Sequence, residues 1–327
     1  MNLIPTTRTV SYRLVTAFAL ALVFVVTTGC DDEDLGTSNA TEPTLAEIAR
    51  SVPVLSTLNT ALQEAGLDEQ LENNGTGLTV FMPQNTAFDA VEVNELTLPQ
   101  NEDILTDVLS YHVVPEVVKI EEGSNPIQPG TQETYPTLEG GTVTIRVAEG
   151  GGVTVNGVPI SNPDVDAANG VAHVADGVLL ESLDAVDRAA VAPQFSILRR
   201  LIDEAGLEET LRGPGPNADD GLTVFAPSDE AFLAALDANG NGRVDDSEVP
   251  NNLGDILAHH VVDGEIFASD IPSGGTSAPT LEGTEVTATA TGDGVTIDSG
   301  DEVAAVAAPD VRIENGVVHG IDTVLLP

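Results

Sequence analysis

The feature that most constrains the fold is an internal duplication. The run LTVFMP at 78–83 recurs as LTVFAP at 222–227, and NGVAH at 169–173 recurs as NGVVH at 315–319. Because the repeated runs keep their order and nearly keep their spacing, one folding unit is used twice. A chain of 327 residues has room for two domains of ordinary size.

Within each unit, helical spacing comes before strand spacing. Apolar residues at helical intervals precede Gly66 and Gly206, and each LTVF run then has the pattern of a buried strand that ends at proline. Farther on, Val143, Ile145 and Val147 alternate at period two. Helices followed by strands indicate an α+β fold and not a parallel doubly wound sheet. We expect the units at 44–183 and 185–327.

These ordered motifs resemble the fasciclin domain. The motifs are the run from Thr223 to Phe232, the Tyr-His-Val-Val segment at 111–114 and the closing strand with Asn-Gly-Val-x-His. The resemblance covers nearly all of the chain after residue 43. It implies two tandem fasciclin-like domains, each with helices packed on a β-sandwich-like wedge. It also implies a role in cell adhesion, matrix contact or surface binding, and no enzyme activity.

The Tyr-His segment has two interpretations. In animal members of that family it is linked to receptor binding, and the corresponding positions here are Tyr111, His112, His259 and His260. His259 stands where the pattern has tyrosine. The alternative, which we favour, is that a histidine before Val-Val at a helix-to-strand junction is buried and fixes the corner by hydrogen bonds. The same interpretation applies to His173 and His319, each inside an apolar strand.

The most specific chemical motif is DANGNGRVDDSE at 237–248, which fits the calcium-loop pattern D-x-[DN]-x-[DN]-G-x5-E. Calcium takes about six to eight oxygen ligands. The predicted ligands are Asp237, Asn239, Asn241, Arg243 through its backbone carbonyl, Asp245 directly or through water, and Glu248.

Neighbouring residues refine this prediction. Gly242 permits the sharp turn, Val244 would anchor the loop to the core, and Pro250 prevents a long helix directly after Glu248. We therefore expect an isolated calcium loop that stiffens the second unit. The first unit has no such loop. The alternative is an acidic surface insertion that matches by chance.

The start of the chain has the features of an export signal. Arg8 and Arg13 precede an apolar stretch at 14–26 that is too short to span a membrane, so 1–29 are predicted to be a signal peptide. The residues TTGC that end at Cys30 resemble the bacterial lipoprotein processing box, in which the cysteine is lipidated. Cys30 is the only cysteine, so no intramolecular disulfide is possible. An ordinary secretory peptide is the alternative.

Residues 30–43 have the composition of an acidic, solvated tether. The acidic run at 31–34 resembles a sorting signal for the outer surface, with plain tether composition as an equal alternative. The expected protein is thus exported and anchored to the membrane through its N-terminal lipid. It would lie on the cell surface or on the periplasmic face of the outer membrane.

Charge limits the partners. The chain has 53 acidic and 11 basic residues and a net charge of -42. Such a protein repels phosphate backbones, which excludes nucleic acid as a partner. The charge favours a halophilic protein that works in high salt, where screening removes self-repulsion. An acidic extracellular protein at ordinary salt is the alternative.

Catalytic motifs are missing from the sequence. It contains no G-x-S-x-G elbow and no H-E-x-x-H helix, and Cys30 is committed to the anchor. We therefore expect a non-enzymatic cell-surface lipoprotein that acts in adhesion or matrix binding, with an extracellular protein or polysaccharide as partner. The alternatives are a surface module that captures a polysaccharide or small ligand and, less favoured, a secreted hydrolase with a carboxylate pair.

Overall fold

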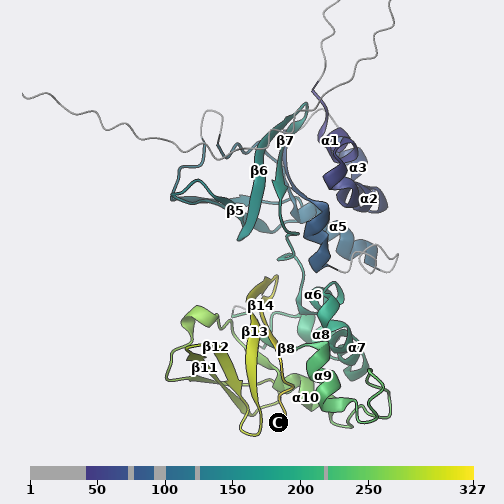
Figure 1. The fold of residues 1–327 in the computed structure, drawn as a ribbon, viewed down its shortest axis with the longest axis vertical. Helices are drawn as coiled ribbons and strands as arrows, with labels where there is room; N and C mark the ends of the chain where they lie inside the picture. The colour runs from purple at the N-terminus through teal and green to yellow at the C-terminus, as the bar shows by residue number, and fades with distance from the viewer. Residues whose placement is uncertain (1–41, 73–76, 92–100, 122–125, 217–219) are drawn as a thin grey trace, which may run out of the picture. The chain divides into compact units, whose positions relative to one another are not determined.

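In the computed structural model each repeat is built on one curled, seven-stranded sheet with helices on one side (Figure 1). The structure describes residues 42–72, 77–91, 101–121, 126–216 and 220–327. The predicted signal peptide, Cys30 and the tether up to residue 41 lie outside these residues. No described helix is long and apolar enough to cross a membrane.

The strands follow the same plan in both repeats. Those of the first repeat are β1 (Leu78–Pro83), β2 (Val113–Val114), β3 (Gln132–Pro136), β4 (Thr142–Val147), β5 (Val153–Val155), β6 (Val158–Ala167) and β7 (Gly170–Ala175). Those of the second are β8 (Leu222–Pro227), β9 (Val261–Asp263), β10 (Thr276–Pro279), β11 (Glu285–Thr291), β12 (Gly294–Asp298), β13 (Val303–Ile313) and β14 (Gly316–Ile321). The spatial order β2-β1-β7-β6-β5-β4-β3 is repeated as β9-β8-β14-β13-β12-β11-β10.

The first and last strands of each repeat lie side by side. β1 pairs in parallel with β7, where Phe81 lies opposite His173, and β8 pairs in parallel with β14, where Phe225 lies opposite His319. The other ladders are antiparallel. Because β1 and β8 are flanked on both sides and covered on both faces, all six of their residues are buried, which explains their continuous apolar pattern.

Each sheet curls until its two ends meet. The backbone N–H of Leu138, just after β3, donates to the carbonyl of Val113 in β2 at 2.8 Å. In the second repeat Leu281 donates to Val261 at 2.8 Å. The predicted wedge is thus nearly closed into a barrel, and it encloses an aliphatic core around Phe81 or Phe225.

A second core in each repeat lies between the sheet and its helices. The helices of the first repeat are α1 (Leu45–Ser51), α2 (Ser56–Glu64), α3 (Asp68–Glu72) and α5 (Glu102–Tyr111). Those of the second are α6 (Ala185–Ala190), α7 (Ser196–Ala205), α8 (Glu208–Arg212), α9 (Asp229–Leu236) and α10 (Leu253–His259). Their apolar faces pack on β1 and β7, or on β8 and β14, and bury Leu58 and Leu105 or Leu198 and Leu257.

The α+β prediction is confirmed, and two local features add to it. The segment through Phe88 is a 3-10 helix (Asn85–Ala90), whereas the equivalent α9 is an α-helix capped by the Ser228 side chain. The short helices α3 and α8 after Gly66 and Gly206 were not predicted, because five residues are too few to show a helical period.

Candidate functional site

The histidines before Val-Val fix a corner in each repeat. The Nδ1 atom of His112 lies 2.7 Å from the Val108 carbonyl, and its Nε2 accepts the Leu179 N–H at 2.9 Å. His260 makes the same pair of bonds, at 2.8 Å to Ile256 and 2.8 Å from Leu325. Each ring therefore joins a helix end to a segment far along the chain, and burial lowers the pKa of both imidazoles to about 4.

A second pair of histidines lies in the closing strands. In β7 the Nε2 of His173 bonds the Val118 carbonyl at 3.0 Å, and its Nδ1 accepts the Asp164 N–H at 3.0 Å. In β14 His319 makes the equivalent bonds to Ile266 and Asp310. Burial lowers the pKa of both rings, that of His173 to about 4. Each of these neutral rings joins the segment after the second strand of its repeat, at Val118 or Ile266, to the long strand β6 or β13.

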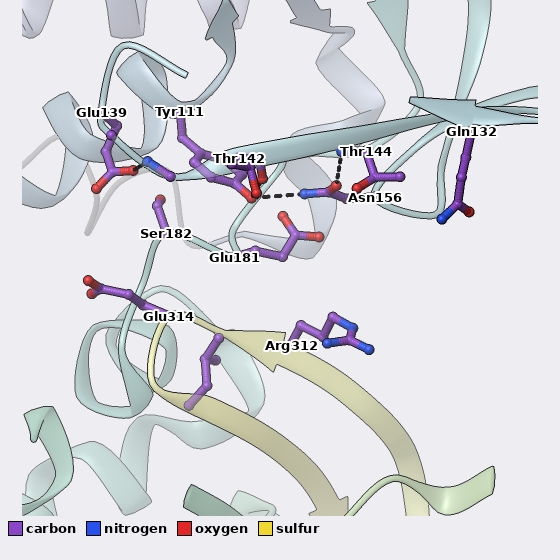
Figure 2. Close-up of a pocket in the computed structure, with 13 residues that line it drawn as sticks. Tyr111, Gln132, Glu139, Thr142, Thr144, Asn156, Glu181, Ser182, Arg312 and Glu314 are labelled. Atoms are coloured by element: carbon purple, nitrogen blue, oxygen red, sulfur yellow. Dashed lines mark hydrogen bonds between the residues drawn. The ribbon is translucent and has the colours of Figure 1, made fainter. Parts of the chain in front are cut away.

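The position before the corner histidine differs between the repeats. The Tyr111 hydroxyl donates to the Thr142 carbonyl at 2.7 Å and accepts the Asn156 side-chain amide at 2.9 Å (Figure 2). In the second repeat Nδ1 of His259 hydrogen-bonds to the Thr284 hydroxyl at 2.7 Å and lies 3.9 Å from the Glu282 carboxylate, and its buried Nε2 has no partner.

The structure leaves little of this segment exposed to a partner. Tyr111 is 4% exposed, and the three histidines at 112, 259 and 260 are 1%, 1% and 2% exposed. The predicted partner-binding residues are buried because the helix that carries them ends against the curled sheet. Their hydrogen bonds serve the fold.

The predicted calcium loop lies between α9 and α10 and folds around its own oxygen atoms. The Asp237 carboxylate accepts the backbone N–H groups of Gly240 and Gly242, both at 2.8 Å, and that of Asn241 at 3.1 Å. The Glu248 carboxylate accepts those of Asn239 and Asp245, both at 3.0 Å. The first and last acids of the motif thus hold the loop in a closed turn.

The middle of the loop is held by the remaining predicted ligands. Asn239 and Asn241 donate their side-chain amides to one oxygen of Asp245, at 3.0 and 2.7 Å, and these bonds lower the pKa of that carboxyl. The Asn241 side-chain oxygen accepts the Arg243 N–H at 3.0 Å. The loop brings the predicted ligands together. The side chains of Asn239 and Asn241 present their amide hydrogens to Asp245, whereas a bound ion would need their amide oxygens.

Two contacts attach this loop to the repeat. Val244 is 6% exposed and packs in the helical core, as predicted. Its backbone carbonyl accepts a hydrogen bond from the guanidinium of Arg200, a residue of α7, at 2.8 Å. In the part of the chain that the structure describes, no group of three or more His, Cys, Asp or Glu side chains is arranged to hold a metal. The loop's own donor set includes amide and backbone oxygens besides its carboxylates.

Comparison with known proteins matches both repeats to one family. The fasciclin domain matches residues 53–181 and 193–327. Protein sll1483 of Synechocystis is 35% identical over 181 residues, which are 53% of this chain and 96% of that protein. The rabbit transforming growth factor-beta-induced protein ig-h3 is 28% identical over 86% of this chain, and human periostin 27% over 80%.

The chain spans almost all of the Synechocystis protein, but only 40% and 29% of the two animal proteins. Among solved structures, a domain pair from the insect cell adhesion molecule fasciclin I is similar over 84% of this chain and 97% of that chain. Its sequence identity is 18% and its TM-score is 0.40.

Proposed function

The chain belongs to the fasciclin domain family, and on that premise we propose that it is a non-enzymatic protein of cell adhesion or surface binding. The observation that carries the proposal is the family match over both repeats, which leaves little of the described chain for a separate catalytic domain. The buried histidines support it further. All five rings have lowered pKa values and serve as fixed hydrogen-bonding groups.

Adhesion is tested with the purified protein coated on beads in molar sodium chloride. We expect the beads to bind cells of the source organism or their isolated matrix, and soluble protein to compete. Beads coated with the protein after thermal unfolding provide the control. Equal retention of coated and bare beads would reject the adhesive role.

We also propose that calcium binds the loop at 237–248 and stiffens the second repeat. The carboxylates of Asp237 and Glu248 already close the loop, and Arg200 and Val244 fix it to α7 and to the core. When the ion binds, the Asn239 and Asn241 amides would turn their oxygens inward. Three carboxylates in a site of this kind suggest a dissociation constant of about 10⁻⁴–10⁻³ M.

Calorimetric titration of calcium in molar sodium chloride tests this site. We expect one ion per chain and no uptake by the Glu248→Ala variant, which loses one of the two acids that close the loop. The Glu139→Ala variant removes an acid of the first repeat, far from this loop in the sequence, and should titrate like the unchanged protein. Absence of heat at millimolar calcium would reject the site.

The anchor is the third part of the proposal. We propose that Cys30 carries the lipid that holds the protein at the cell surface or at the periplasmic face of the outer membrane. Mass spectrometry of the N-terminal peptide is expected to show a lipidated cysteine. A Cys30→Ser variant should leave the membrane fraction, and retention of that variant in the membrane would contradict the anchor.

A further inference from the structure

Four of the six buried side-chain atoms that lack a hydrogen-bond partner in the described chain gather at one place. They belong to the segment that leads from the first repeat into α6, and to α6 itself. The atoms are Oε2 of Glu181, Oγ of Ser182, and Nε and Nη1 of Arg188. A buried polar group without a hydrogen bond costs roughly 1–3 kcal/mol, so several in one place call for an occupant that bonds to them.

Two cavities adjoin these side chains. One, of about 260 Å³, is lined by Glu181 and Arg188 together with Asp310 of β13. The other, of about 680 Å³, is lined by Ser182, Glu139 and Glu314 (Figure 2). Both cavities share Asn156, Glu181 and Arg312 in their walls, and we refer to the two cavities together as the polar groove.

The walls of the groove are held in place by contacts on either side. Asn156 is fixed by its bonds to the Tyr111 hydroxyl and to the Thr144 N–H, at 2.9 and 2.8 Å. The Arg312 guanidinium lies 4.3 Å from the centre of the Phe267 ring. The Glu314 N–H donates to the Leu183 carbonyl at 2.9 Å, which ties the end of β13 to the connecting segment. These contacts set the positions of the Asn156 and Arg312 side chains in the walls of the groove.

The mixture of charges selects the ligand chemistry. The walls of the groove contain arginine donors, Arg188 and Arg312, and carboxylate acceptors, which are Glu139, Glu181, Glu314 and Asp310. Each hydroxyl group of a sugar can both accept and donate a hydrogen bond. An anionic ligand would meet Glu139, Glu181 and Glu314, and a cationic ligand would meet Arg188 and Arg312. A neutral, hydroxyl-rich molecule can hydrogen-bond to both the acidic and the basic side chains, and it brings no charge of its own into the groove.

We propose that this groove binds a neutral sugar residue of a polysaccharide, with Arg188 and Arg312 donating to its hydroxyl groups and Glu181 accepting from them. The orphaned atoms are covered, so the Arg188 and Glu181 side chains rotate toward the cavity to meet the sugar. The inference rests on the proposed role in surface binding and names the chemical class of one partner.

The test uses the whole exported protein and three neutral trisaccharides, cellotriose, maltotriose and mannotriose. Trigalacturonate and spermidine serve as charged comparators. Saturation-transfer NMR and calorimetric titration in molar sodium chloride measure binding. We expect millimolar binding of at least one neutral trisaccharide, weakened roughly tenfold or more by Glu181→Gln and by Arg188→Met.

Further variants separate recognition from folding. Arg312→Met changes a strand residue at the wall that both cavities share and should weaken binding even if Arg188→Met fails to fold. Arg199→Met removes an exposed arginine of α7 that lines neither cavity, and binding should be unchanged. The inference is overturned if no neutral trisaccharide binds at millimolar concentration, if only a charged comparator binds, or if the groove variants bind like the unchanged protein. If the groove inference fails but the coated beads still bind cells, the proposed adhesive function holds and does not depend on this groove.

Discussion

The backbone N–H of Leu179 donates a 2.9 Å hydrogen bond to Nε2 of His112, across 67 residues of the sequence. Leu325 and His260 repeat the contact at 2.8 Å across 65 residues. In both repeats a neutral imidazole thus joins the end of a helix to the segment that follows the last strand.

Loss of this ring should destabilise one repeat selectively. His112→Leu leaves the Leu179 N–H and the Val108 carbonyl without partners, and we expect it to lower the free energy of unfolding by about 2–4 kcal/mol. Tyrosine fluorescence during urea unfolding reports on the first repeat, since Tyr111 and Tyr135 both lie there. His260→Leu should leave the tyrosine transition in place while shifting the circular dichroism signal. Equal shifts of the tyrosine signal in both variants would contradict this assignment.

Acid should destabilise the fold through its buried histidines. Burial places the pKa of His112, His173 and His260 at about 4, below the ordinary value of 6.5. Between these values the unfolded chain binds more protons than the folded chain, so stability falls as the pH is lowered from about 6.5 to 4. Each ring contributes up to about 3 kcal/mol.

Proton NMR of the imidazole signals measures this effect. No histidine should titrate at its ordinary pKa, because burial lowers the pKa of all five. Glu181 works in the opposite direction, since burial raises its pKa and the folded state then retains a proton that the unfolded state has lost. Histidine signals that titrate near pH 6.5 in the folded protein would show that these rings are accessible to water.

A methyl group at Gly316 should prevent the parallel pairing of β14 with β8. A Cβ atom there would lie 2.0 Å from the Leu222 carbonyl oxygen, and the residue has a φ of +152°. We expect Gly316→Ala to cost more than about 3 kcal/mol, measured by thermal unfolding. Gly292→Ala, where a Cβ meets no atom within 4 Å, should change stability by less than about 0.5 kcal/mol. Similar melting temperatures for the two variants would refute the steric argument.

The two residues that precede the corner histidines should respond differently to replacement by phenylalanine. Tyr111→Phe removes a hydroxyl with two partners and should cost about 1–2 kcal/mol. His259→Phe removes one hydrogen bond, from Nδ1 to Thr284, together with a buried nitrogen that has no partner, and Thr284 retains its 2.7 Å bond to Glu282. We therefore expect the smaller loss for His259→Phe in urea unfolding. A larger loss at position 259 would mean that Nε2 of its ring has a partner in solution.

Salt should stabilise the protein because its net charge is high. With a net charge of -42, the folded chain brings carboxylates closer together than the unfolded chain does. Asp107 and Glu314 show the effect, since burial and neighbouring acids raise the pKa of both carboxyls. We expect the melting temperature to rise from dilute buffer to molar sodium chloride. Equal melting temperatures in the two buffers would exclude the halophilic interpretation.

The sequence predicted features whose cause is local. Six consecutive buried residues in β1 follow from an apolar run that ends at proline, and the NGV-x-H motif marks the closing strands in both repeats. The motif needs glycine because a side chain there would collide with the backbone of β1 or β8. It needs histidine because the ring makes two hydrogen bonds, one of them to Asp164 or Asp310. Residues 237–248 likewise form the compact acidic loop that their motif indicates.

Features that depend on distant segments were not predictable. Nothing near Leu78 or Gly170 shows that their strands pair in parallel, and nothing near Val113 shows that Leu138 closes the sheet. The burial of Tyr111 depends on the same closure. Arg188 and Glu181 carry no motif, and only the packing around them reveals that Oε2 of Glu181 and Nε and Nη1 of Arg188 lack partners.

The parallel pairing of first and last strands also affects when each repeat can fold. β1 has its central partner only after β7, about ninety residues later, has been synthesised, and β8 likewise waits for β14. A chain emerging in order from a ribosome or a secretion channel therefore lacks a complete sheet until each repeat is complete. Such a topology delays completion of each sheet until its last strand is available.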